Sequence, residues 1–103
     1  MTWFARDDYG TPIPALKPST VQTVSIGASS TATTSAVGST TRIVRVVADV
    51  ACYIQVASSP TASTSTTYLP ANVIEYLRVK EGTDKVAVMH DANTGTLNVT
   101  EMV

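Results

Sequence analysis

The chain has 103 residues and a formal net charge of −1, and charged residues make up only 15% of it. A hydrophobic share of 44% excludes a fully disordered chain, and seven basic against eight acidic residues cannot build the basic stripe of a nucleic-acid-binding module. A single cysteine excludes an internal disulfide framework. We expect one domain with no membrane span and no secretory signal, because no 18-residue apolar window occurs and the start, MTWFARDD, lacks the required pattern.

Residues 1–20 differ in composition from the rest of the chain, because they hold three of the five prolines and the only Trp and Phe. Proline removes backbone donors and disfavours helix at the preceding residue, so this segment is predicted to be an extended arm. Large aromatic side chains gain free energy on burial. The arm is therefore expected to dock either on its own domain or on a neighbouring subunit, through Trp3, Phe4, Tyr9, Ile13 and Leu16.

Residues 21–103 predict β structure throughout, since β-branched residues dominate and no stretch shows helical periodicity. Turn residues divide this part into eight short strands. The expected fold is a small antiparallel β-sandwich, jelly-roll-like or immunoglobulin-like, and a small barrel also stays open because strand order is not readable from one sequence. The expected strands are residues 21–26, 33–37, 41–48, 51–57, 65–69, 73–80, 85–90 and 96–101.

Alternation along these strands separates a buried face from an outward face. Strand 41–48 is apolar on both faces, which predicts a central position in its sheet. A core of small aliphatic side chains is thin, so oligomerisation or docking on a larger body would help to stabilise the domain. The low charge also leaves strand edges poorly protected against pairing with other chains. The predicted core consists of Val44, Val46, Cys52, Ile54, Val56, Leu77, Val79, Val86, Val88, Leu97 and Val99.

Catalytic chemistry has few candidates in this sequence. His90 is the only histidine, and Asp91 beside it could orient it as a general base. No Gly-x-Ser-x-Gly elbow supplies a nucleophile, so His90 is interpreted as a strand-end residue beside a turn. Cys52 falls on the inward face of its strand and is interpreted as a buried structural thiol. We therefore expect no enzyme activity and no catalytic residues.

Metal and cofactor motifs are also weak. Residues 91–95, DANTG, loosely resemble a calcium loop, but Gly95 stands fifth instead of sixth and Glu101 arrives one position early. A hairpin turn closing on Gly95 is the prediction here. One cysteine and one histidine give no zinc spacing, and no Gly-rich phosphate loop occurs, so neither a metal nor a cofactor is expected.

A small basic spot is predicted where Arg78 and Lys80 share one face of a strand and Lys85 joins them across a hairpin. Acidic residues at Glu75 and Asp84, with another at position 81, oppose it. The balance favours a solvated surface of mixed charge and no nucleic-acid partner.

Three segments of the C-terminal half form one pattern: YLPANVIEYLRV at residues 68–79, KVAV at 85–88 and GTLNVTEM at 95–102. This pattern resembles small β-rich structural proteins encoded by tailed double-stranded DNA bacteriophages. The resemblance covers roughly residues 41–103. The arm, residues 1–20, matches no motif of that group.

The resemblance implies a virion component, made in the host bacterial cytoplasm and placed on the capsid surface. It would act as a decoration or cement protein that binds the major capsid protein and copies of itself, as a homodimer or homotrimer. Two alternatives stay open. One is a head–tail, neck or tail-associated structural protein. The other is a carbohydrate-binding or host-adhesion module, for which outward-facing Tyr53 would be the best stacking residue.

Overall fold

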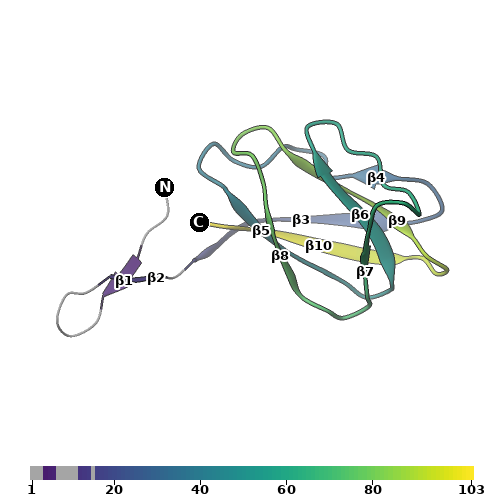
Figure 1. Ribbon diagram of the computed structural model, residues 1–103, viewed down its shortest axis with the longest axis horizontal. Helices are drawn as coiled ribbons and strands as arrows, with labels where there is room; N and C mark the ends of the chain where they lie inside the picture. Colours follow the sequence, from purple (N-terminus) through teal and green to yellow (C-terminus); the bar gives the residue numbers. More distant parts are fainter. Residues whose placement is uncertain (1–3, 7–11, 15) are drawn as a thin grey trace.

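The computed structural model describes residues 4–6, 12–14 and 16–103, and strands are its regular secondary structure (Figure 1). A two-stranded ladder near the N-terminus precedes eight strands that form the body. The ladder consists of β1 (Phe4–Arg6) and β2 (Pro12–Pro14). The body consists of β3 (Pro18–Ile26), β4 (Thr31–Ala32), β5 (Ile43–Ala48), β6 (Cys52–Ala57), β7 (Thr67–Leu69), β8 (Glu75–Arg78), β9 (Lys85–His90) and β10 (Gly95–Met102).

The eight body strands form two antiparallel four-stranded sheets, in the orders β3-β10-β5-β8 and β4-β9-β6-β7. The chain changes sheet at every step except from β6 to β7, and the first and last body strands lie side by side. This is the strand order of a jelly roll. The predicted all-β sandwich is confirmed, and among the orders left open by the sequence the structure selects the jelly roll. β5 has a neighbour on each side, as its two apolar faces predicted.

The core lies between the two sheets and takes side chains from both. Nine of the eleven predicted core residues are buried there, while Val56 and Leu77 are partly buried and pack against the cluster. The cluster also holds Ile26 and Leu69, which are among its largest fully buried side chains. Most of the remaining members are valines, so the core is thin. The complete cluster is Val24, Ile26, Val37, Val44, Val46, Ala48, Cys52, Ile54, Leu69, Val79, Val86, Val88, Leu97 and Val99.

The predicted strand at residues 33–37 is wrong, because the ladder with β9 ends after Ala32. Thr33 still donates its backbone N–H to the Val86 carbonyl at 2.9 Å, but the Val86 N–H binds the Thr33 hydroxyl at 3.2 Å. A side-chain oxygen thus replaces the carbonyl that a regular ladder would use. The chain then continues irregularly along β9, with Val37 bonded to the Asp84 carbonyl at 2.9 Å.

The predicted hairpins around β9 are also wrong, because β9 lies in one sheet and both β8 and β10 lie in the other. The turn at residues 91–95 therefore crosses between layers. Gly95 opens β10 next to Asp49, whose carboxylate accepts the Thr96 N–H at 2.8 Å. For the same reason Lys85 does not join Arg78 and Lys80 across a hairpin, since it stands in the opposite sheet.

Glu101 is a buried acid at the inward side of β10, opposite Val44. Its Oε1 atom accepts a hydrogen bond from the Gly38 N–H at 2.8 Å and another from the Thr41 hydroxyl. The Gly38 carbonyl in turn accepts the Gly82 N–H at 2.9 Å. One carboxylate therefore fastens the irregular segment before β5 to the end of the sandwich, which compensates for burying its charge.

The N-terminal ladder pairs Phe4 with Pro14 and Arg6 with Pro12. Alternate residues of an antiparallel strand point their N–H groups outward, so prolines spaced by two leave the ladder intact. Figure 1 shows β1 and β2 apart from the two sheets. The body begins earlier than residue 21, since β3 starts at Pro18 and Lys17 exchanges two backbone hydrogen bonds with Val103, at 2.7 and 2.8 Å. In the described ranges, no helix has the length and apolar character needed to cross a membrane.

Candidate protein-binding surface

The outer face of the β3-β10-β5-β8 sheet carries exposed apolar side chains among polar ones. The registers place Val21, Thr100, Arg45 and Tyr76 in one row across the sheet, so that Val21 and Tyr76 stand at its two edges. Val21 is 53% exposed and Tyr76 is 59% exposed. We call this surface the open face. By register its outward side chains are Val21, Thr23, Ser25, Ile43, Arg45, Val47, Tyr76, Arg78, Thr96, Asn98, Thr100 and Met102, of which Thr100 is itself buried.

The outer face of the β4-β9-β6-β7 sheet is different, because the connection between β6 and β7 folds over it. The Thr61 N–H donates to the Gln55 side chain at 2.7 Å, and the Ala62 N–H donates to the Ser30 hydroxyl at 2.8 Å. Ala62 and outward-facing Ala87 are both buried, yet neither belongs to the core cluster. The protein therefore covers part of one outer face with its own chain, whereas no such connection folds over the other.

Further apolar side chains border the open face at the turn before β8. Val73 and Ile74 are exposed there, directly before the strand that carries Tyr76. Asn72 holds this turn with a φ of 60°, and its N–H donates to the Ala48 carbonyl at 2.7 Å. Alternation along residues 73–80 groups Ile74, Tyr76 and Arg78 on one face of their strand, but the sequence does not tell that this face points outward. The β5–β8 register supplies that information.

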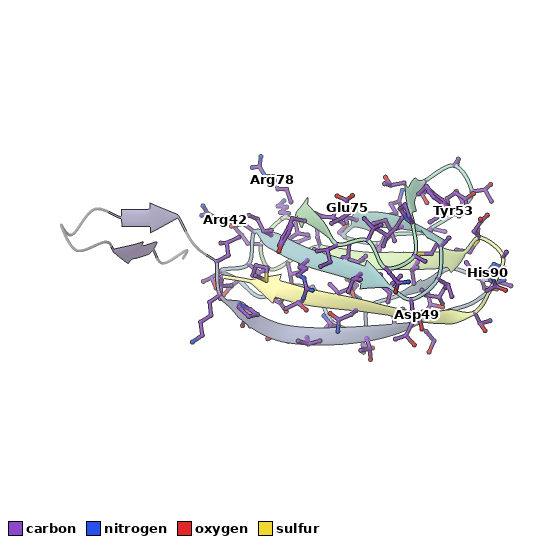
Figure 2. All side chains as sticks on the ribbon, turned by 90° about the horizontal axis from the view of Figure 1, so that it is seen from below. Arg42, Asp49, Tyr53, Glu75, Arg78 and His90 are labelled. Carbon is purple, nitrogen blue, oxygen red and sulfur yellow. The ribbon has the colours of Figure 1, made fainter. Side chains whose placement is uncertain are left out.

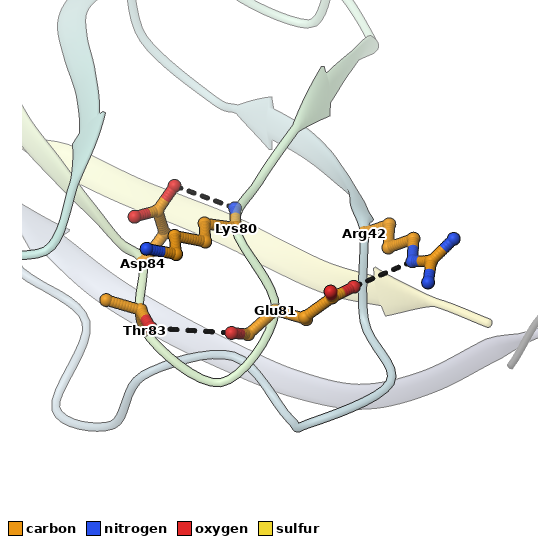
Figure 3. Close-up of polar contacts among 5 residues, drawn as sticks. All are labelled: Arg42, Lys80, Glu81, Thr83 and Asp84. Atoms are coloured by element: carbon orange, nitrogen blue, oxygen red, sulfur yellow. Dashed lines mark hydrogen bonds and ion pairs between the residues drawn. The ribbon is translucent and has the colours of Figure 1, made fainter.

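Charged residues gather in a cleft at one end of the sandwich, of about 410 Å³, lined by Arg42, Arg78, Val79, Lys80, Glu81 and Asp84. Figure 2 shows Arg42 and Arg78 at the end nearest the β1–β2 ladder. Arg42 pairs with Glu81 at 2.7 Å, and the Asp84 carboxylate accepts the Lys80 N–H at 2.8 Å (Figure 3). Because the ion pair is exposed, it contributes little stability, on the order of 0–1 kcal/mol. The lining of this cleft has the mixture of basic and acidic residues that the sequence predicted for this surface.

His90, Asp49 and Tyr53 lie at the opposite end of the sandwich (Figure 2). Asp91 accepts a hydrogen bond from the Tyr53 hydroxyl at 3.3 Å. The Asp91 carboxylate thus bonds to a tyrosine and not to the adjacent histidine. Burial and the neighbouring Asp91 carboxylate raise the pKa of Tyr53. The His90 Nδ1 atom is buried without a hydrogen-bond partner. Within the described residues, no group of three His, Cys, Asp or Glu side chains could hold a metal ion.

Cys52 is fully buried opposite His90 in the β6–β9 ladder. Burial, with a smaller contribution from the Asp49 carboxylate, raises the pKa of its thiol from 9.0 to about 11. At neutral pH the sulfur is therefore a protonated thiol packed in the core, and it is a poor nucleophile.

Ionisation of Cys52 makes stability fall at alkaline pH. The thiol of the unfolded chain ionises near its ordinary pKa of 9.0, whereas the folded thiol ionises at about 11. The folded state therefore loses stability relative to the unfolded state as the pH rises from 9 through 11. The thermal midpoint of a Cys52→Ala variant should fall less steeply over this range than that of the wild-type protein. Equal slopes would show that the thiol does not contribute.

The structure describes only some of the five residues that were expected to anchor the arm. Trp3 and Tyr9 lie outside the described residues. The backbone of Phe4 and Ile13 belongs to β1 and β2. Leu16 is half-buried just before β3.

Comparison with known proteins gives no relative from which a function could be carried over. No family model matches the chain, and neither a curated protein nor a solved structure is significantly similar to it.

Proposed function

We propose that the chain is a virion structural protein of a tailed double-stranded DNA bacteriophage, and that it binds the major capsid protein shell as a decoration or cement subunit. The observation that carries this proposal is the open face, a partly apolar sheet surface with exposed Val21 and Tyr76, over which no connection folds, whereas the β6–β7 connection covers part of the opposite face. Jelly rolls occur in viral capsid domains and also in lectins and cupins, so the fold agrees with the proposal without selecting it.

The composition of the open face suits a protein partner. Aromatic and Arg side chains are enriched at the centres of protein interfaces, and the open face offers Tyr76 and Arg45 in adjacent positions of one row. Its charged members are Arg45 and Arg78, since Glu75 falls on the other side of β8. We therefore expect the docking site on the shell to be apolar with acidic groups around it.

Capsid stabilisation needs only a modest contact for each copy. A subunit seated where capsomers meet touches more than one of them, and a large number of copies acts on the same shell. The N-terminal arm adds a second contact in this proposal, because its Trp3 and Phe4 side chains would bind a neighbouring subunit. The body and the arm would thus staple adjacent capsomers together.

Binding to shells tests the proposal. Expanded capsids assembled without this protein, from the phage or prophage that encodes it, are mixed with the full chain and sedimented. We expect saturable binding, and we expect Tyr76→Ala to weaken it by about tenfold or more, as truncation of a central interface tyrosine does. Tyr68→Ala is the matched control, because Tyr68 is 50% exposed but stands in the other sheet.

Two results of this experiment would contradict separate parts of the proposal, and a truncated chain tests a third part. Failure of the wild-type chain to bind shells contradicts the proposed function. Equal weakening by both tyrosine variants contradicts the assignment of the open face. Removal of residues 1–15 tests the arm, and unchanged occupancy would exclude its part in the mechanism.

Carbohydrate binding is the second candidate, and one specific observation favours it. Tyr53 and Tyr68 form an edge-to-face pair on the outer side of the β6–β7 ladder, with ring centroids 5.5 Å apart. Exposed aromatic rings at such a place can stack on sugar rings. A glycan array separates the two candidates, because glycan binding that is lost in Tyr68→Ala would support this function and not capsid docking.

A further inference from the structure

The body has four edge strands, and they differ in length. β3 has nine residues, whereas β8 has four, β7 has three and β4 has two. Very short edge strands are protected by having few free backbone groups. In the described part of the chain only β10 pairs with β3, so every second residue of β3 directs its N–H and C=O away from the ladder.

β3 also lacks the charged residues, the mid-strand proline and the mid-strand bulge that usually protect a long edge strand from pairing with another chain. The strand reads PSTVQTVSI and contains no charged residue. Its proline stands at the first position, and the register irregularity between Thr100 and Met102 lies opposite that same end. Gln22 reaches the irregular segment between β4 and β5, where its side-chain amide exchanges hydrogen bonds with the Ser35 backbone at 3.0 and 3.2 Å. Those bonds use the Gln22 side chain and leave the outward-directed backbone groups of β3 without a ladder partner.

The side chains along β3 favour pairing with another strand. Val21 is the most exposed aliphatic side chain among the large hydrophobic residues of the described chain, and it stands outward on this edge. Thr20 and Thr23 beside it are exposed and β-branched. Such residues pack well against their counterparts on an adjacent strand.

We propose that β3 pairs antiparallel with β3 of a second copy of this chain, forming a two-fold symmetric dimer. Antiparallel pairing of a strand with itself is isologous, so the same edge serves on both sides. Because β3 is neutral along its whole length, two copies meet without like-charge repulsion. The two β3-β10-β5-β8 sheets then become one continuous eight-stranded sheet.

The arrangement explains the exposure of Val21. When the two-fold axis passes near Gln22, at the middle of β3, the Val21 side chains of the two copies lie close together on the same face. The two open faces merge into one larger surface. Each N-terminal arm leaves its own β3 at Pro18, which lies next to the partner's Ile26 in this pairing, so the arm runs beside the second copy.

An edge-to-edge contact is smaller than a standard protein interface, which buries roughly 1,600 Å² in total. We therefore expect a reversible dimer with a dissociation constant on the order of micromolar. This inference stands on the geometry of β3 and does not depend on capsid binding.

Sedimentation velocity of the full chain over a concentration series tests the dimer. We expect a concentration-dependent shift from monomer to dimer, and we expect Val21→Lys to raise the dissociation constant by about tenfold or more, since it places two ammonium groups near the axis. The matched control is Tyr76→Lys, because Tyr76 stands in the same row of the same face with similar exposure, at the opposite edge. It should leave the dissociation constant unchanged.

A monomer at every concentration would overturn the inference, and so would a dimer weakened by Tyr76→Lys but not by Val21→Lys. Thr23→Lys, at another exposed outward position of β3, provides a second variant if Val21→Lys lowers the thermal midpoint. Backbone amides of β3 should also gain protection from hydrogen exchange as the concentration rises. Because these measurements use no capsid, failure of the dimer and failure of the proposed function give different results.

Discussion

Leu97→Ala is expected to lower the free energy of unfolding by about 2–5 kcal/mol, the largest single effect on this fold. Leu97 is fully buried on β10, between Val24 of β3 and Ala48 of β5. It is one of the few large side chains in a core made chiefly of valine. Leu97 itself stands on a central strand that is held by ladders on both sides, so the cavity left by truncation cannot collapse readily.

This loss is large in relation to the whole, since a domain of this size has a total stability of about 5–15 kcal/mol. Urea unfolding followed by circular dichroism measures it. Tyr76→Ala is the control, because an exposed position should change the unfolding free energy by no more than about 0.5 kcal/mol. A cost below about 1 kcal/mol for Leu97→Ala would contradict the described packing of the core.

Gly95→Ala is expected to cost about 1–3 kcal/mol, although the position lies in a connection between layers. A Cβ atom there would stand 2.2 Å from the Asp49 Oδ1 atom and 2.7 Å from a methyl group of Val50. Asp49 cannot move aside freely, because the same oxygen accepts the Thr96 N–H at the start of β10. Relief of the clash therefore breaks that hydrogen bond or shifts the β9–β10 crossover.

The control for Gly95→Ala is Gly27→Ala. No atom lies within 4 Å of a Cβ built at Gly27, and its φ is not in the left-handed region. An alanine there should leave stability unchanged or raise it slightly by restricting the unfolded chain. Equal midpoints of thermal unfolding for the two variants would contradict the close approach of Asp49 to Gly95.

The sequence predicted the strands because their pattern is local. Alternation and turn residues depend on neighbours in the chain, so strands such as 85–90 were found at the bounds that the structure shows. The alternation of Val44 and Val46 against Arg45 likewise gave the side that faces the core. These signals require no knowledge of which strand lies beside which.

The arrangement of strands into layers was not predictable in this way. A turn such as residues 91–95 looks the same whether it closes a hairpin or crosses between sheets, because the partner of β10 is β3, far away in the chain. Thr33 is a good strand residue, yet its hydroxyl took the place of a carbonyl and ended the ladder. In both cases a long-range contact decided the outcome.

The open face illustrates the same limit for function. Alternation in the sequence placed Tyr76 and Arg78 on one face of their strand. The low charge of the chain indicated that its strand edges carry few charged residues. The sequence could not show that the β6–β7 connection covers part of one outer face while no connection folds over the other. That asymmetry arises from contacts such as Ala62 with Ser30, which join loops distant in sequence.

We propose that the open face of the β3-β10-β5-β8 sheet is the surface that docks on a capsid. The most direct measurement is a cryo-electron microscopy map of expanded shells saturated with the full chain. Docking through the open face predicts density for the body with Tyr76 and Arg45 against the major capsid protein and with the β6–β7 connection facing solvent. Density with Gln55 and Tyr68 against the shell, or shells that stay bare at saturating concentration, would contradict it.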